Sequence, residues 1–170
     1  MLNLYLMRHG KSDWESYLGN DFSRNISEIG IKKTNFIGSY LQKEKIRIKK
    51  IICSPSTRTR ETMELVLKYL DCKPEIEFVE KIYSGNEIDL LKVLKSNKNS
   101  CTSILVIGHE PTLSSFIETI SDDINNSIFK KATWKFSTSS LFNFCFETNQ
   151  WDGISSFNSE IKFYLKPKIL

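Results

Sequence analysis

Apolar residues fall into short runs and helically spaced sets that alternate through the first 120 positions of the chain. Apolar runs at residues 2–7, 48–53, 76–79 and 104–107 have the length and composition of strands. Between and after them, apolar side chains recur three and four positions apart, as on the buried face of a helix. These sets are Ile29, Phe36, Ile37, Tyr40 and Leu41; Met63, Val66, Leu67 and Leu70; Leu90, Leu91 and Leu94; and Leu113, Phe116, Ile117 and Ile120.

Helix-start signals stand before the first two sets. Ser27 is a suitable N-cap for the first helix. Ser54 is the candidate N-cap of the second helix, with Pro55 at its first helical position. Later in the chain, apolar residues alternate with other residues over 142–146 and again over 161–165. We interpret these stretches as two strands that are half exposed or lie at an edge of the sheet.

This alternation of strands and helices predicts an α/β protein, a three-layer α/β/α sandwich with a mainly parallel central sheet. The run at 104–107 is apolar on both faces, as expected of a strand with helices on each side. No repeat, low-complexity tract or long linker divides the sequence. We therefore expect residues 1–170 to form a single domain.

Composition and charge narrow the class of protein. Apolar residues make up 40% of the chain and charged residues 26%, and a net charge of +4 is too small for a dedicated nucleic-acid binder. The four cysteines show neither zinc-ligand spacing nor a redox pair, so we expect reduced thiols. The first residues do not show the basic, apolar and small-residue pattern of a secretory leader, and no apolar run approaches ~18 residues, so we expect neither a leader nor a membrane span. We expect a cytoplasmic protein that binds neither nucleic acid nor membranes.

Both histidines of the chain lie just after a predicted strand. His9 stands in the stretch LYLMRHGKS, and His109 follows the strand at 104–107. In open α/β sheets, ligands bind beyond the carboxyl ends of the strands. A third strand leads into CSPSTRTR, where Arg58 lies in the first turn of a helix, whose free N–H groups favour anions. The residues expected to share one pocket are therefore Arg8, His9, Arg58 and His109.

The chemistry of these side chains favours phosphate. Arginine adds a flat, permanently charged fork that suits phosphate oxygens. Arg60 is about 200° around the helix from Arg58, so only Arg58 is expected to face the ligand. Neighbouring arginines repel a metal ion such as zinc, and the sequence has no Gly-rich phosphate loop. We expect a small dianion in the pocket, and neither a metal nor a cofactor.

Histidine adds a nucleophile to this pocket. Its ordinary pKa, near ~6.5, leaves a neutral nitrogen that can attack phosphorus at neutral pH. Transfer through His9 would split hydrolysis into two steps, and the arginines and a protonated His109 would stabilise charge on the phosphoryl oxygens. The sequence thus predicts phosphoryl transfer by way of a phosphorylated histidine.

Three motifs in this order resemble those of the histidine phosphatase superfamily, which also holds the cofactor-dependent phosphoglycerate mutases. The motifs are LYLMRHGKSDW, ICSPSTRTRET and ILVIGHEPTL. The chain length and the stretches DFSRNISEIG and FYLKPK are most similar to small SixA-type phosphohistidine phosphatases. The resemblance implies a phosphoglycerate mutase-like fold, with His9 as the phosphorylated nucleophile. The other members of the phosphate pocket would be Arg8, Arg58 and His109.

The resemblance also implies contacts with substrate. Arg24, within DFSRNISEIG, corresponds to an arginine that small members of the family keep near the pocket. Gly10, Lys11 and Glu110 flank the two histidines and are further candidates. With Arg24 they make up the predicted substrate-binding residues.

Departures from the family pattern bear on the leaving group. Glu110 stands where small relatives often have asparagine, and Asn25 and Ile26 stand where they often have Pro-Leu. Larger relatives use a glutamate after the third strand as a proton donor, and the nearest equivalent position here holds Lys81. Glu110 and Glu87 are the nearest carboxylates in the sequence. Because an alkoxide leaving group needs a proton, we expect poor turnover of alkyl phosphates.

Three functions are compatible with these residues. The first is a metal-independent phosphatase that acts on phosphohistidine in a protein, such as a histidine-phosphotransfer domain, or on another phosphorylated substrate. The second is a phosphoglycerate mutase-type phosphotransferase, which the lack of a clear proton donor and of enclosing loops disfavours. The third is a non-catalytic phospho-recognition module, which the presence of all four pocket residues disfavours.

Overall fold

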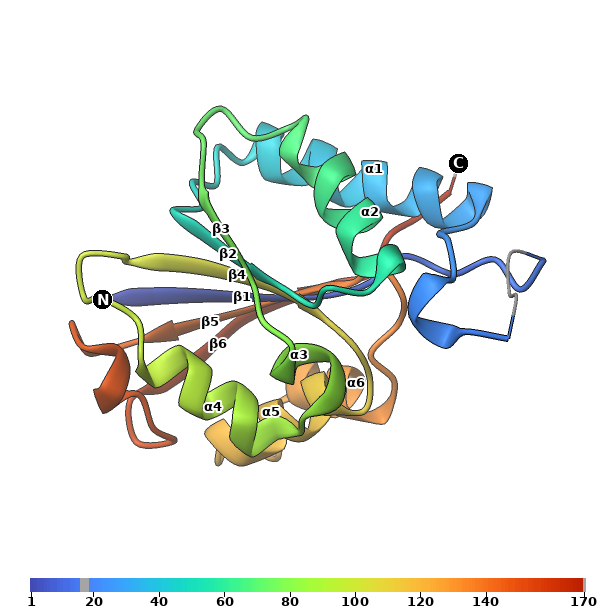
Figure 1. The fold of residues 1–170 in the computed structure, drawn as a ribbon. Helices are drawn as coiled ribbons and strands as arrows, with labels where there is room; N and C mark the ends of the chain where they lie inside the picture. Colours follow the sequence, from blue (N-terminus) through green and yellow to red (C-terminus); the bar gives the residue numbers. More distant parts are fainter. Residues whose placement is uncertain (16–18, 170) are drawn as a thin grey trace.

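The computed structural model describes residues 1–15 and 19–169, which form a six-stranded sheet between two layers of helices (Figure 1). The strands are β1 (Leu2–Arg8), β2 (Lys50–Cys53), β3 (Glu75–Phe78), β4 (Ser103–Gly108), β5 (Leu141–Phe146) and β6 (Ser159–Leu165). Their order in the sheet is β3-β2-β4-β1-β5-β6. Strands β1 to β4 run parallel, whereas β5 runs antiparallel to both β1 and β6. The predicted α/β fold with a mainly parallel sheet is confirmed.

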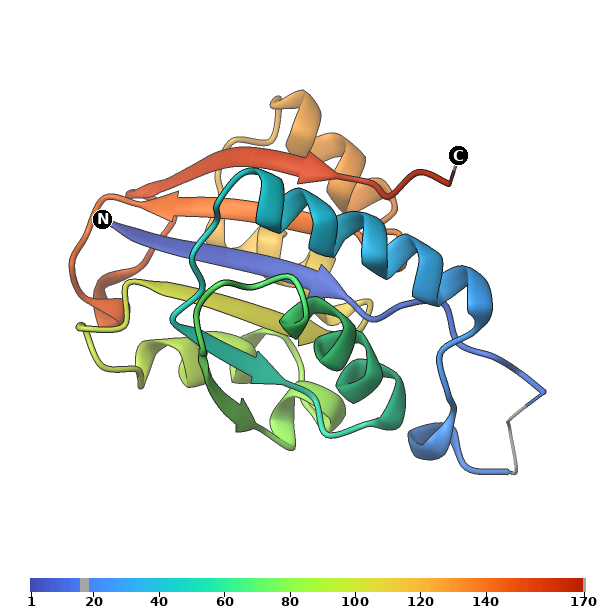
Figure 2. The ribbon, with the colours of Figure 1, turned by 90° about the horizontal axis from the view of Figure 1, so that it is seen from above.

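Helices cover both faces of the sheet. Helices α1 (Glu28–Lys43) and α2 (Thr57–Leu67) lie on one face (Figure 1). The other face carries α3 (Lys81–Ser84), α4 (Glu87–Lys95), α5 (Thr112–Ile120) and α6 (Ser127–Trp134). Two short 3-10 helices are η1 (Asp21–Ser23) and η2 (Trp151–Gly153). Figure 2 shows that β1, β2 and β4 all point toward the same end of the sheet, which places their carboxyl ends together.

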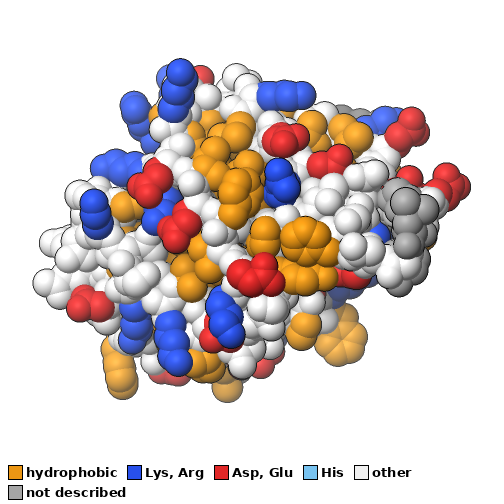
Figure 3. All heavy atoms as spheres, viewed as in Figure 1, with side chains coloured by type: hydrophobic (Ala, Val, Ile, Leu, Met, Phe, Trp, Pro, Cys, Tyr) orange, Lys and Arg blue, Asp and Glu red, His pale blue; other side chains and the backbone are white. Residues whose placement is uncertain are grey.

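The face of the molecule in Figure 3 is mixed. Charged side chains of both signs are spread over it, with apolar side chains between them. None of the described helices combines the length and the apolar character needed to cross a bilayer.

Side-chain caps define where several helices begin. Ser27 Oγ accepts a hydrogen bond from the N–H of Gly30, which confirms the predicted start of α1. Asn86 and Asp89 form a capping box at the start of α4. Asn126 caps α6, a helix that apolar spacing alone does not predict. Each such cap contributes about 1 kcal/mol to helix stability.

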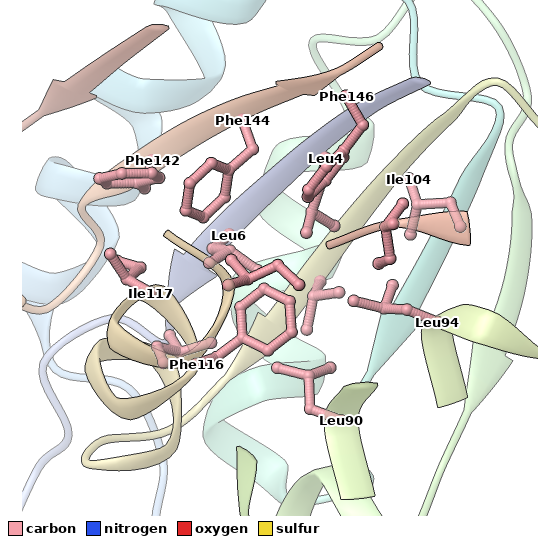
Figure 4. Packing of buried hydrophobic residues seen from close by; sticks show 14 of the residues in the cluster. Leu4, Leu6, Leu90, Leu94, Ile104, Phe116, Ile117, Phe142, Phe144 and Phe146 are labelled. Carbon is pink, nitrogen blue, oxygen red and sulfur yellow. The ribbon is translucent and has the colours of Figure 1, made fainter. Parts of the chain in front are cut away.

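Two apolar cores lie on either side of the sheet. In the larger one, side chains from α4 and α5 meet those from β1, β4 and β5 (Figure 4). The smaller one joins α1 and α2 to the opposite face of the same strands. Full burial of one such aliphatic or aromatic side chain stabilises the fold by about 1.5–3 kcal/mol. The two cores fix β1 and β4, from which the site described below extends.

Strand β5 is an interior strand, which corrects the prediction of a half-exposed strand over 142–146. It lies between β1 and β6, and all six of its residues are buried. The polar Asn143 is satisfied inside the sheet, because its side-chain N–H groups donate to the carbonyl oxygens of Leu4 at 3.1 Å and Phe144 at 3.0 Å. The other predicted strand of this kind, over 161–165, is part of β6, which does lie at an edge of the sheet, opposite the edge formed by β3.

Helix α2 begins later than the sequence predicts. Its first residue is Thr57 and its N-cap is Ser56, rather than Ser54. Ser54 lies in the preceding loop, where its N–H donates to the carbonyl oxygen of Ile107 at 3.1 Å.

In α1, Ile29 is 40% exposed and so lies outside the buried face predicted for it.

Candidate active site

Three strand ends bring the four predicted pocket residues together. Arg8 ends β1 in register with Gly108 at the end of β4, so His9 and His109 follow side by side. Their ring centroids lie 5.2 Å apart. Arg58 is the second residue of α2, which follows β2. The four side chains line one pocket of about 620 Å³.

The backbone around His9 is held from two directions. The His9 N–H donates to the carbonyl oxygen of Gly108 at 3.1 Å. The Ser139 N–H donates to the carbonyl oxygens of Arg8 and His9, both at 3.1 Å, and Ser139 Oγ lies 2.9 Å from Thr34 Oγ1 of α1. Ser139 has a φ of 61°, a left-handed conformation that is uncommon outside glycine. A strained residue thus fixes the end of β1.

His9 lies on the floor of the pocket, and only 7% of its surface is exposed. A carbonyl oxygen can only accept a hydrogen bond, so the 2.7 Å contact between His9 Nδ1 and the Gly10 carbonyl oxygen places the ring proton on Nδ1. Nε2 therefore carries the lone pair. Burial lowers the pKa of His9 to about 3, in opposition to the bond to Gly10. The ring is neutral at neutral pH, the state in which an imidazole is nucleophilic.

His109 carries its proton on the other nitrogen. Arg58 Nη2 can only donate and lies 3.3 Å from His109 Nδ1, so the proton is on Nε2, 2.8 Å from Ser54 Oγ. Burial and then the charge of Arg58 lower the pKa of His109 to about 4. The sequence predicts a protonated His109, whereas this pKa makes the ring neutral at neutral pH. Ser54, predicted as a helix cap, instead orients this ring.

The arginines are anchored through their Nη atoms. Arg8 Nη1 donates to the carbonyl oxygen of Phe136 at 2.9 Å. Arg58 Nη1 donates to the carbonyl oxygen of Asp21 at 2.9 Å, and Arg58 Nη2 donates to Asp21 Oδ2 at 3.1 Å. Among the described residues, the Nε atoms of Arg8, Arg24 and Arg58 are buried and have no hydrogen-bond partner. Buried donors without acceptors are rare, so three around one pocket indicate a site for an anion.

Asp21 and Tyr83 are among the residues of the pocket wall that sequence reasoning misses. Asp21 accepts hydrogen bonds from Arg24 Nη1 and from the Tyr83 hydroxyl, both at 3.0 Å, in addition to those from Arg58. Burial opposes ionisation of Asp21, but the hydrogen bonds from Arg24 and Tyr83 and the charge of Arg58 outweigh it and lower its pKa. The only signal in the sequence is the position of Asp21, three residues before Arg24.

Arg24 lies in the pocket wall and is buried. Its guanidinium donates to Asp21 and to Ser12 Oγ. Its Cζ lies 3.6 Å from the ring centroid of Trp14, which also lines the pocket. Arg24 is thus held by a carboxylate, a hydroxyl and an aromatic face.

Two of the other predicted substrate contacts also line the pocket. Lys11 is exposed in its wall. Glu110 lies in the wall too, but its carboxylate accepts hydrogen bonds from the N–H of Ser114 at 2.8 Å and from the Ser114 hydroxyl at 2.7 Å. Its carboxylate oxygens are therefore engaged at the start of α5.

Gly10 is buried and does not line the pocket. Its N–H donates to Thr62 Oγ1 at 2.9 Å, and so is not free to bind substrate. A Cβ atom at this position would overlap the side chain of Ile26. The predicted substrate contact at Gly10 is therefore replaced by close packing and by the carbonyl that orients His9.

The positions considered for a proton donor lie elsewhere. Lys81 starts α3 and Glu87 lies in the first turn of α4, and neither lines the pocket. The residue of α3 that reaches the pocket is Tyr83. Arg60 is exposed, and its Cζ lies 5.5 Å from the ring centroid of Phe78. It turns away from the pocket, in the direction that helical geometry predicts.

The pocket is cationic. Four cationic side chains and two carboxylates line it, so its net charge is +2 while both imidazoles are neutral. The cations are Arg8, Lys11, Arg24 and Arg58, and the carboxylates are Asp21 and Glu110. This charge complements a phosphoryl dianion. Within the described part of the chain, no three His, Cys, Asp or Glu side chains are grouped as a metal site requires.

Residues 4–82 match the model of the histidine phosphatase superfamily (branch 1). The matched segment, 79 of the 170 residues, is similar to that family. It contains the motifs at the ends of β1 and β2, whereas His109 lies beyond it. This similarity and the fold support phosphatase activity.

The proteins that this chain is similar to have a length close to its own. An uncharacterized protein of Mycobacterium leprae is 26% identical over 139 residues, which are 79% of this chain and 84% of the relative. The phosphohistidine phosphatase SixA of Escherichia coli is 24% identical over 112 residues, 65% of this chain and 68% of SixA. The structure of a protein assigned as SixA from Nakamurella multipartitia has a TM-score of 0.84 at 18% identity and covers 98% of this chain and 96% of its own. That likeness shows the shared fold.

Proposed function

We propose that this protein is a metal-independent phosphohistidine phosphatase of the histidine phosphatase superfamily, which transfers the phosphoryl group of a phosphorylated protein to His9 and then to water. One observation carries the proposal. His9 is a neutral ring whose proton is held on Nδ1 by the Gly10 carbonyl, and its Nε2 lone pair is available in a cationic pocket. A site that only bound phosphate would need donors, and not a nitrogen lone pair.

In the first step, the lone pair of His9 Nε2 attacks phosphorus, and the bond to the leaving group breaks with its electron pair on the departing atom. Negative charge spreads over the phosphoryl oxygens, which Arg8 and Arg58 bind. The approaching dianion raises the pKa of His109, which takes up a proton and becomes a further donor. Phosphorylated His9 is an imidazolium, because Nδ1 keeps its proton.

In the second step, water attacks the phosphorus of phosphorylated His9 and the P–N bond breaks. The electron pair returns to Nε2, which restores the neutral ring, and the protons of the water leave with the phosphate product. The Gly10 carbonyl assists because it keeps a proton on Nδ1. The group that departs is then neutral imidazole, a far better leaving group than its anion.

The pocket wall favours a leaving group that needs no acid from the enzyme. Glu110 is engaged by Ser114, and the hydrogen bonds from Arg24 and Tyr83 keep Asp21 ionised against the effect of burial. Neither carboxyl group is suited to donate the proton that an alkoxide requires. Imidazole departs without it. The description of the Escherichia coli relative as a phosphohistidine phosphatase supports the same substrate class here.

The test is to trap the phosphorylated form of His9. Brief mixing with a protein that carries labelled phosphohistidine, in EDTA and followed by an alkaline quench, should leave acid-labile phosphate on the peptide that contains His9. His9→Ala should lose the label and nearly all turnover but stay folded, because this strand-end side chain contributes little to the core. A label on the peptide with His109, or no label in a single turnover, would contradict the proposal.

A further inference from the structure

Asp21 is a half-exposed carboxylate at the rim of the pocket. Its side chain is 48% exposed, whereas His9, on the floor of the same pocket, is 7% exposed. Phosphoryl transfer takes place in line, so the leaving group departs on the side of phosphorus opposite His9. The leaving group of a bound substrate therefore faces the rim, where Asp21 lies.

The carboxylate of Asp21 is fixed by three donors, from the residue that follows η1 and from helices α2 and α3. Arg24 donates to Oδ1 at 3.0 Å, and Arg58 and Tyr83 donate to Oδ2 at 3.1 Å and 3.0 Å. The arginines hold Asp21 in its charged form. Two carboxylate oxygens together offer about four acceptor positions, so these donors leave room for one more. The exposed part of the side chain can therefore accept a hydrogen bond from a ligand.

A carboxylate near a bound phosphoryl dianion weakens its binding by like-charge repulsion. A leaving group with a positive charge would instead be attracted to the carboxylate. The ring of a phosphohistidine is such a group, because its second nitrogen takes up a proton and then donates from an N–H. A phenolate or an alkoxide has no such N–H and gains negative charge as it departs.

We infer that Asp21 accepts a hydrogen bond from the free ring N–H of the substrate phosphohistidine and so holds that ring protonated for departure. The inference rests on the proposed function, because it concerns the leaving group of that reaction. The Gly10 carbonyl has the equivalent position on the His9 ring. Two imidazoles flank the phosphorus, and each has an acceptor for its second nitrogen.

The step balances without transfer of a proton between the substrate ring and Asp21. The P–N bond to the protonated substrate ring breaks, and its electron pair stays on the ring nitrogen. That ring leaves as neutral imidazole, with its remaining N–H still donated to Asp21. The His9 ring becomes the imidazolium in its place. Asp21 thus selects phosphoramidates over phosphomonoesters, and Glu110, the other carboxylate of the wall, is engaged by Ser114.

The experiment compares two substrates in Asp21→Asn, which keeps the shape of the side chain and removes its charge. For a phosphohistidine protein, the single-turnover rate of phosphoryl transfer should fall by ~10²-fold, in the range of a group that acts on a transferred or held proton. For an aryl phosphate the rate should change far less. Asp21→Glu keeps the charge and should recover part of the loss. Asp152→Asn, on η2, is the control for removal of an acidic charge far from the pocket.

The pH profile adds a readout that a structural role would not move. With the phosphohistidine protein, the pH above which the single-turnover rate falls should be lower in Asp21→Asn than in the wild type, because the substrate ring loses its proton more easily. The pH profile of the rate with the aryl phosphate should not shift. Because that substrate has no ring nitrogen, its profile shows only the titration of the enzyme's own groups. The charged and titratable groups that face the pocket with Asp21 are Arg8, His9, Lys11, Arg24, Arg58, Tyr83, His109 and Glu110.

The outcomes separate the two proposals. Equal losses on both substrates, with no shift of either profile, would show that Asp21 only positions Arg58, and would overturn the inference while leaving the proposed function intact. A wild-type protein that turns over the aryl phosphate but not the phosphohistidine protein would contradict the proposed function itself.

Discussion

At the scale of single residues, two arginines on one helix have different surroundings. Arg58 reaches Asp21 and His109 inside the pocket. Arg60, two positions later, is exposed and lies over the ring of Phe78. The difference follows from helical geometry, since two positions correspond to about 200°. The pair therefore offers a matched test of what the pocket requires from arginine.

Arg58→Lys should lower kcat/KM by at least ~10²-fold, because lysine keeps the charge but loses the planar fork that stabilises the transferred group. Arg60→Lys should leave kcat/KM nearly unchanged. Steady-state kinetics with an aryl phosphate measure both variants. Similar losses in the two would contradict the orientation of α2 described above.

The residues that the sequence reveals are those that follow strands. His9 and His109 could be predicted to meet because the carboxyl ends of parallel strands lie at one edge of a sheet. Asp21 could not, because its partners Arg58 and Tyr83 lie 37 and 62 positions away, and an aspartate in a polar stretch resembles any solvated loop residue. Ser54 was similarly ambiguous, since a serine before a helix is most often its cap.

At the scale of elements, β5 links the parallel part of the sheet to its antiparallel edge. Phe144, at its centre, is fully buried and packs against three rings. The ring centroids of Phe142, Phe146 and Phe116 lie 4.8, 5.7 and 6.5 Å from that of Phe144. This aromatic cluster holds β5 against α5, and β5 in turn supports β1.

Phe144→Ala should lower the free energy of unfolding by ~3–5 kcal/mol, the usual effect of removing a buried phenylalanine ring. Phe157, whose surface is 95% exposed, provides the control. Phe157→Ala should change the free energy of unfolding by less than ~0.5 kcal/mol. Urea unfolding curves followed by circular dichroism measure both. A small effect at Phe144 would mean that the larger core does not depend on β5.

Elements with a strong apolar pattern could be predicted from the sequence. Elements whose burial depends on contacts with distant parts of the chain could not. The runs at 2–7 and 104–107 are apolar on both faces and became β1 and β4. In β5 the alternation with Asn143 suggested a solvent-exposed face, but hydrogen bonds to backbone carbonyls allow that side chain to be buried. Helix α6 buries only Phe129 and Ala132, too few positions for a periodic signal.

At the scale of the whole molecule, much of the net positive charge lies in the pocket. The protein has a net charge of +4, and the pocket alone contributes +2 while both imidazoles are neutral. The rim is accessible, because Lys11 and Trp14 are exposed and Asp21 is half exposed. A phosphate carried on a protein surface can therefore approach His9. These features together define which phosphorylated substrates we expect to react.

A phosphohistidine protein and an aryl phosphate should react at least ~10²-fold faster than a simple alkyl phosphate, because only an alkoxide needs a proton from the enzyme as it leaves. The measurement is kcat/KM for the three substrates across pH, with EDTA present. Comparable values for all three, with an acidic group in the profile that disappears in Glu110→Gln, would contradict this expectation. Glu110 would then be the proton donor of a broad phosphomonoesterase.

The order of strands also limits when the pocket can form during synthesis of the chain. β1 carries the nucleophile in the first nine residues, but its neighbours in the sheet are β4 and β5, from residues 103–108 and 141–146. A nascent chain that has reached residue 82 contains the whole LYLMRHGKS stretch and neither neighbour. The pocket also includes His109, so it can form only after these segments have been synthesised. Incomplete chains carry the motif without the pocket.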